Sequence, residues 1–167
     1  MSPQARAALG SAAFLVAAPG VVAGLGPWLL TRWEAGDPEP PLVLQLLGAG
    51  LIVAAAAILL HAFGRFVVDG LGTPAPVAPT ERLVVNGPYR YVRNPMYLAV
   101  AAALGGQALV LGSPVLLAYL AAFAAAVVSF VRWYEEPTLL RRFGADYEAY
   151  RRAVPGWWSR RTPWRGA

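Results

Sequence analysis

The sequence contains no cysteine and no lysine, and it has a single histidine, His61. Without cysteine the chain can form neither disulfides nor thiolate metal sites, and it has no cysteine nucleophile. One histidine is too few for a histidine-rich metal site, so we expect no bound metal. Charge is scarce as well, because 14% of the 167 residues are charged and 57% are hydrophobic. Long apolar segments explain this balance better than an unusually large core.

The net charge of +5 is carried entirely by arginine. In a soluble protein such a balance would suggest nucleic acid as the partner. Here the arginines flank apolar runs, so anionic lipid head groups of the bilayer are the expected counter-charge and no nucleic-acid partner is expected. The Ala- and Arg-rich composition without lysine is typical of a bacterium with GC-rich DNA. We therefore expect the protein in the bacterial inner membrane.

Four apolar runs can each cross a hydrocarbon core of about 30 Å. They cover about residues 7–30, 42–63, 95–111 and 114–134. The sequence therefore predicts an all-α, polytopic membrane protein with four transmembrane helices in one integral membrane domain. A cleaved signal peptide is the competing interpretation of the first run. The length of that run, the single Arg6 before it and the spans after it favour a retained helix.

The arginines are divided unevenly between the two sides of these spans. Arg32 lies alone on one side, while Arg6, the loop after the second span and everything from Arg132 onward lie on the other. The positive-inside rule then predicts cytoplasmic N- and C-termini. After the fourth span, apolar residues recur at helical spacing among charged ones, with Gly144 as an interruption. This pattern predicts a cytoplasmic amphipathic helix and tail over residues 135–167.

Two polar clusters flank the third and fourth spans. The first is the connector, residues 81–97, which includes the turn-rich stretch Asn86–Tyr97, and the second is Arg132–Glu136. The short turn at residues 112–114 predicts a hairpin, so both clusters should emerge on the same side. Adjacent carboxylates next to hydrocarbon repel each other and need donors or a cation. Either the connector's arginines or a bound cationic ligand would satisfy Glu135 and Glu136.

A plainer interpretation exists for most of these residues taken singly. Arginine and tyrosine at span ends are commonly topology signals and aromatic-belt anchors. His61 lies one helical turn before Arg65, and an interfacial hydrogen-bonded side chain explains it better than a ligand or base.

The ordered set of motifs over the C-terminal half is more specific than any one of its parts. The set consists of Leu83–Tyr89, Arg93–Tyr97, Glu135–Glu136, Leu140, Phe143–Gly144, Tyr147, Tyr150 and Val154–Pro155. It resembles the membrane-integral methyltransferases, which include isoprenylcysteine carboxyl methyltransferase and the phospholipid N-methyltransferases. The resemblance implies S-adenosyl-L-methionine as the methyl donor, bound in a cytoplasmic pocket. It also implies a lipophilic small-molecule or lipid acceptor that arrives from the bilayer.

The resemblance also implies roles for individual residues. The implied cofactor contacts are Arg82, Leu83, Val84, Tyr89, Arg93, Asn94, Pro95, Met96, Tyr97 and Glu135. The implied catalytic residues are Arg132, Glu136 and Asn94. Arg132 would orient an acceptor carboxylate, and Glu136 would remove a proton from an acceptor amine. Asn94 stands where the prenyl-protein enzymes have histidine, and it can hydrogen-bond but cannot titrate.

Two alternatives from other classes compete with the enzyme hypothesis. The first is a non-catalytic membrane scaffold, or a lipid-head-group-binding subunit, whose arginines only hold head groups. The second is a membrane reductase or heme-pathway component. The lone His61 and the lack of a Gly-rich phosphate loop argue against the second.

Overall fold

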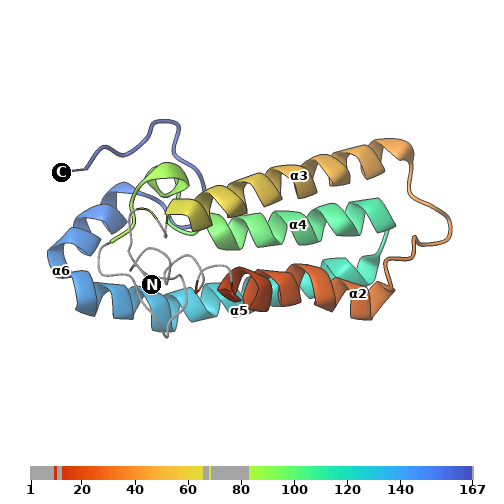
Figure 1. Cartoon of the computed structure of the whole chain (residues 1–167), viewed down its shortest axis with the longest axis horizontal. Coiled ribbons are helices and arrows are strands. Elements are labelled where there is room, and N and C mark those ends of the chain that lie inside the picture. Colours follow the sequence, from red (N-terminus) through yellow and green to blue (C-terminus); the bar gives the residue numbers. More distant parts are fainter. Residues whose placement is uncertain (1–9, 11–12, 66–67, 69–82, 167) are drawn as a thin grey trace.

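The structure is a computed structural model that describes residues 10, 13–65, 68 and 83–166. Over this part of the chain all regular secondary structure is helical, which confirms the predicted all-helical class (Figure 1). The first helix, Ala13–Thr31, consists mainly of a π-helical segment and a short α-helix. The elements are η1 (Val16–Leu25), α2 (Gly26–Thr31), α3 (Leu42–Arg65), η3 (Gly87–Arg90), α4 (Pro95–Leu111), α5 (Pro114–Phe130), η4 (Val131–Glu135) and α6 (Glu136–Ala153).

Three helices are long and apolar enough to cross a membrane: Ala13–Thr31, Leu42–Arg65 and Pro114–Ala153. The helix predicted as the third span, α4, is apolar but has only 17 residues. That length is at the lower limit of about 17 residues for a spanning helix. The predicted first span begins at residue 7, which lies outside the described residues.

The α4–α5 hairpin is built from local signals at both of its ends. Pro95 and Pro114 each occupy the first helical position, where a missing N–H costs nothing. Between them, Gly112 ends α4 with a left-handed φ of 60°. The Ser113 side chain then accepts a hydrogen bond from the Leu116 N–H and caps α5. The predicted hairpin is therefore present.

Close packing of α3 on α4 forms the centre of the bundle. A Cβ atom at Gly48 would lie 2.5 Å from the Gly106 carbonyl oxygen, and one at Gly106 would lie 2.6 Å from the Gly48 carbonyl oxygen. Only glycine at both positions permits this approach, as is common between membrane helices. Leu104, on α4, is fully buried.

The two ends of the bundle differ in character (Figure 1). At one end, the loop after α2 meets the α4–α5 turn, where the Gly36 N–H donates to the Leu111 carbonyl at 2.7 Å. At the other end lie η3, η4, α6 and the C-terminal segment. We call this second end the connector end.

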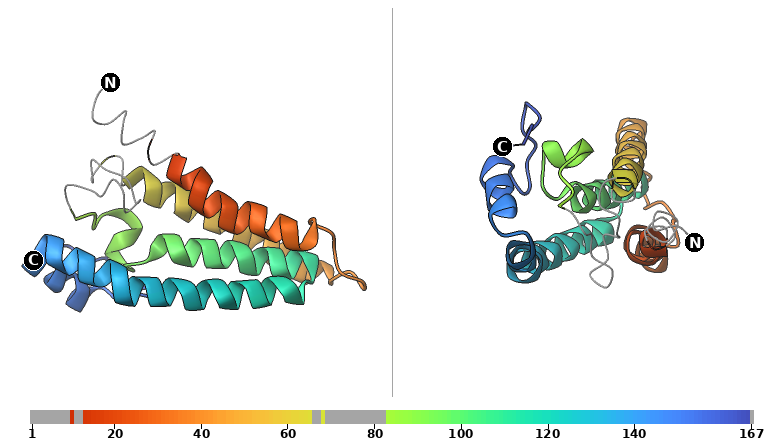
Figure 2. Two further views of the ribbon diagram at one scale, coloured as in Figure 1. Left: turned by 90° about the horizontal axis from the view of Figure 1, so that it is seen from below. Right: turned by 60° about the vertical axis from the view of Figure 1, so that its left-hand side comes forward.

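The chain bends back at the connector end. The helix runs from α5 through η4 into α6, and Gly144 (φ 52°, ψ −123°) then breaks it, as the sequence predicted. Figure 2 shows the ribbon changing direction within α6. Beyond the break, Tyr147, Tyr150 and Val154 form a buried cluster. The C-terminal tail returns to the connector through backbone bonds, including one from the Trp164 N–H to the Arg90 carbonyl at 2.9 Å.

Candidate active site

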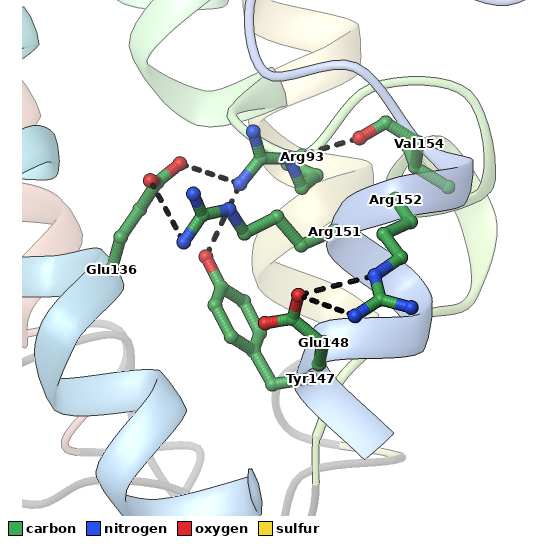
Figure 3. Close-up of polar contacts among 7 residues, drawn as sticks. All are labelled: Arg93, Glu136, Tyr147, Glu148, Arg151, Arg152 and Val154. Carbon is green, nitrogen blue, oxygen red and sulfur yellow. Dashed lines mark hydrogen bonds and ion pairs between the residues drawn. The ribbon is translucent and has the colours of Figure 1, made fainter. Parts of the chain in front are cut away.

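Arg93 links the connector to α6 (Figure 3). Its Nη1 donates to Oε1 of Glu136 and, at 3.2 Å, to the hydroxyl of Tyr147. Its Nε donates to the Val154 carbonyl at 2.9 Å. Arg151 adds a weaker ion pair to Oε2 of Glu136 at 3.9 Å. The guanidinium therefore contacts two residues of α6 and also Val154, the residue that follows α6.

The adjacent glutamates point to different partners. Glu136 is taken up by the ion pair with Arg93, whose side chain is 15% exposed against 20% for Glu136. Glu135 instead accepts a hydrogen bond at 2.9 Å from the hydroxyl of Tyr97, in the first turn of α4. This separation gives each carboxylate its own hydrogen-bond donor and so offsets part of their mutual repulsion. It also leaves Glu135 facing a cavity.

The cavity lies between the connector, α4, α5 and the first helix and measures about 190 Å³. Its polar half contains the aromatic, amide and charged side chains Tyr89, Arg93, Asn94, Tyr97 and Glu135, next to Pro95 and Met96. Its apolar half contains Phe14, Ala18, Pro19, Val22, Val100 and Phe123. Sites for drug-sized ligands usually measure about 300–1,000 Å³. The cavity therefore suits the reacting end of a larger ligand.

The polar half is held in place by buried contacts. Tyr89 is 6% exposed, and its carbonyl accepts a hydrogen bond at 2.7 Å from the Tyr150 hydroxyl. Burial raises the pKa of the Tyr89 phenol well above its ordinary value, so the group stays protonated. Asn94 is 7% exposed. A Cβ at Gly156 would lie 3.2 Å from Nη2 of Arg93, so this glycine lets the tail close over the connector.

The residues with predicted roles fall into three groups. Those that line the cavity are Tyr89, Arg93, Asn94, Pro95, Met96, Tyr97 and Glu135. Those that the structure places away from the lining are Leu83, Val84, Arg132 and Glu136. Leu83 packs on the Tyr147 cluster, and Val84 packs on Ala62 and Tyr89. Arg132 is exposed on η4. Arg82 lies outside the described residues.

Sequence reasoning missed the apolar half of the cavity. Phe14, Ala18 and Val22 follow one another at intervals of four residues, a spacing that places side chains on one helix face. This spacing and Pro19 were the signals in the sequence that pointed to the cavity-lining face. In a helix that is apolar all round, however, no polar side chains distinguish one face from another.

His61 does not reach this cavity. It lies with Gly87, Pro88, Arg90 and Tyr91 along a separate groove. Among the residues that the structure describes, no three histidine, aspartate or glutamate side chains converge as metal ligands.

A bundle of apolar helices that holds a carboxylate, a guanidinium and phenols around a cavity at one end has the features of a membrane-embedded enzyme. The family model for phospholipid methyltransferase matches residues 42–146. The chain therefore belongs to the phospholipid methyltransferase family, whose members are membrane methyltransferases, and this confirms the family resemblance. Neither a curated protein nor a solved structure gives a significant match.

Proposed function

We propose that the protein transfers a methyl group from S-adenosyl-L-methionine to a lipid or other lipophilic acceptor in the membrane. Family membership supports the reaction class. The observation that carries the proposal is the hairpin geometry, which joins the connector and Glu135 around one cavity.

The polar half suits the reacting end of this donor. S-adenosyl-L-methionine, when bound, supplies a methyl group on a cationic sulfur. Glu135 offers an anionic acceptor for the donor's ammonium or hydroxyl groups. The rings of Tyr89 and Tyr97 are suited to a nearby cation. Asn94 offers both a donor and an acceptor of hydrogen bonds.

The chain's contribution to methyl transfer would be orientation and exclusion of water. In an in-line displacement, the acceptor's lone pair forms the new bond to carbon while the carbon–sulfur bond breaks and its electron pair stays on sulfur. Holding both partners in line is worth up to several kcal/mol of the barrier. Glu136 is tied to Arg93, so we assign it to positioning and assign the contact with ligand to Glu135.

The apolar half supports an acceptor with a hydrocarbon chain. Within this class, the resemblance also predicts an isoprenylcysteine-type carboxylate, which Arg132 would orient. Arg132 is exposed on η4 and is not part of the cavity lining, whereas Glu135 is. This arrangement supports a lipid amine more than a carboxylate, because Glu135 would repel an anionic acceptor.

The distribution of charge supports an orientation. Arg32 follows α2 at one end of the bundle, whereas the other arginines that the structure describes belong to elements at the connector end. By the positive-inside rule the connector end and both termini would be cytoplasmic, in the bacterial inner membrane.

The test is methyl transfer by the full-length protein in detergent or vesicles. Purified, folded protein is mixed with methyl-labelled S-adenosyl-L-methionine and phosphatidylethanolamine vesicles, and in parallel with a bacterial lipid extract, and labelled lipids are identified by mass spectrometry. We expect label in lipid with the wild type and a large loss with Glu135→Gln. Absence of transfer to both lipid preparations, together with no binding of the donor, would support the scaffold alternative instead.

A further inference from the structure

The apolar wall of the cavity comes largely from the first helix, which lies outside the residues that match the family. The match begins at residue 42, whereas Phe14, Ala18, Pro19 and Val22 belong to Ala13–Thr31. How this helix is held against α4 and α5 therefore determines the shape of the apolar half.

Pro27 creates a backbone problem in this helix. The N–H of Gly26 bonds to the carbonyl of Val21, five residues earlier. The next residue, Pro27, has no N–H to donate. The N–H of residue 27 would bond to the Ala23 carbonyl in an α-helical register and to the Val22 carbonyl in a π-helical one, so neither carbonyl receives a donor from this position. Between apolar helices, an unpaired carbonyl is costly.

Side chains from two neighbouring helices bind these same two carbonyls. Nε2 of Gln107, on α4, donates to the Ala23 carbonyl at 2.8 Å. The Tyr119 hydroxyl, on α5, donates to the Val22 carbonyl at 3.1 Å. Both side chains are polar groups on otherwise apolar helices.

Gly26 makes room for one of these bonds. A Cβ atom at Gly26 would lie 2.6 Å from the Tyr119 hydroxyl oxygen, which is too close for any real contact. The pair Gly26-Pro27 therefore both frees the carbonyls and lets Tyr119 reach one of them.

We propose that Gln107 and Tyr119 are positioning residues that hold the first helix in place and so shape a subsite for the acceptor's hydrocarbon chain. The inference rests on the proposed function and deepens it. The polar half is held separately, by the bonds from Arg93 of the connector to Glu136 of α6 and to Val154. Selection of the acceptor chain then depends on a helix outside the family match, while donor binding depends on residues within it and on the tail.

The first experiment separates acceptor binding from donor binding. Phosphatidylethanolamines of graded acyl length serve as the acceptor probe for the wild type, Gln107→Leu and Tyr119→Phe, and S-adenosylhomocysteine binding is measured by calorimetry. Each variant loses its one hydrogen bond to the first helix, and Gln107→Leu also loses a bond within α4, from Nε2 to the Ala103 carbonyl at 3.3 Å. We therefore expect the acceptor KM to rise about 3- to 10-fold. Chain-length preference should broaden, and the donor-analogue Kd should stay within about 2-fold.

Gln45→Leu is the matched control. Its Nε2 also donates to a backbone carbonyl, that of Pro40, at 2.8 Å, but at the far end of the bundle. The same chemical change there should leave the acceptor KM and the chain-length preference unchanged. An equal rise in acceptor KM in Gln45→Leu would show a general effect of stability and would overturn the inference.

A second measurement does not require turnover. Because the chain has no cysteine, spin labels can be placed at introduced cysteines on the exposed residues Val21 and Leu117. We expect a narrow distance distribution in the wild type and a broader one in Gln107→Leu and Tyr119→Phe. Adding Pro27→Ala to Tyr119→Phe supplies an N–H within the first helix but no bond to α5, so the distribution should stay broad.

The outcomes distinguish the inference from the proposed function. If wild-type protein binds S-adenosylhomocysteine, but both Gln107→Leu and Tyr119→Phe keep the wild-type distance distribution, the inference is wrong and the proposed function stands. If folded wild-type protein does not bind S-adenosylhomocysteine, the proposed function is wrong, whatever the spin labels show.

Discussion

The two halves of the cavity are held by different kinds of contact. In the polar half, the charged Arg93 bonds to a carboxylate, a phenol and a carbonyl. In the apolar half, neutral donors from Gln107 and Tyr119 each bind a backbone carbonyl of the first helix. Bonds to charged groups are roughly twice as strong as neutral ones. The polar half should therefore be rigid and the apolar half more adaptable.

This difference suits a transferase with one fixed and one variable substrate. A methyl donor of constant structure benefits from a preorganised site. The lipid acceptor meets the wall formed by the first helix, which neutral hydrogen bonds hold less strongly than the ion pair holds the polar half. The predictions below test this comparison, from the largest expected effect to the smallest.

The largest effect should follow the loss of Arg93. Arg93→Leu leaves Glu136 with the weaker pair to Arg151 at 3.9 Å and removes the bond from Arg93 to the Val154 carbonyl. Breaking a largely buried pair in this way should lower the free energy of unfolding by about 3 kcal/mol and abolish binding of S-adenosylhomocysteine. Thermal unfolding in detergent and calorimetry measure the two effects.

Arg93→Lys sharpens the same comparison. Lysine keeps the charge but cannot reproduce the planar set of donors, so an intermediate loss is expected. A leucine variant with wild-type stability would show that the polar half does not depend on this ion pair.

The second largest loss of stability should come from changes at the contact between α3 and α4. Gly48→Ala places a Cβ 2.5 Å from the Gly106 carbonyl oxygen. Forcing α3 away from α4 should cost about 1–3 kcal/mol, measured as loss of thermal stability. Gly50→Ala is the matched control, because nothing lies within 4 Å of a Cβ there. Equal effects of the two variants would contradict the packing of α3 on α4.

Glu135→Gln should weaken the donor site without unfolding it. The change removes a charge that faces the cavity but keeps an acceptor for the Tyr97 hydroxyl. Loss of a charge-assisted bond should raise the Kd for S-adenosylhomocysteine about 10- to 100-fold. Glu148→Gln, in an exposed pair with Arg152, should leave that Kd unchanged. The assignment fails if the two variants bind alike.

The smallest effect should come from Tyr150. Tyr150→Phe removes the buried hydrogen bond to the Tyr89 carbonyl and should cost about 1 kcal/mol of stability. Because Tyr89 lines the cavity, a modest rise in the Kd for S-adenosylhomocysteine should accompany the loss. Unchanged stability would indicate that the carbonyl finds another donor.

Local signals account for the parts of the fold that could be predicted. Proline at the start of α4 and α5, with Gly112 between them, predicts the hairpin. The positive φ at Gly144 explains the predicted interruption of the last helix. Because α4 and α5 have the same length of 17 residues, the hairpin returns the chain to the end where it began. The meeting of the connector with Glu135 and Glu136 therefore followed from those signals.

Contacts between distant segments could not be predicted in the same way. Nothing in the pair Glu135-Glu136 indicates which carboxylate binds Arg93 and which faces the cavity. That depends on how the π-helical segment η4 rotates the side chains around the helix axis. The first helix is apolar on all sides, so no difference in polarity marked the face that lines the cavity. Gln107 and Tyr119 became interpretable only when their partners across the bundle were known.

The central claim is that the connector and Glu135 enclose one binding site for a methyl donor. Calorimetric titration of the folded, full-length wild type with S-adenosylhomocysteine tests it most directly. The account predicts saturable binding at a single site that Glu135→Gln weakens strongly. Absence of binding to the wild type, or equal binding to the wild type and Glu135→Gln, would contradict it.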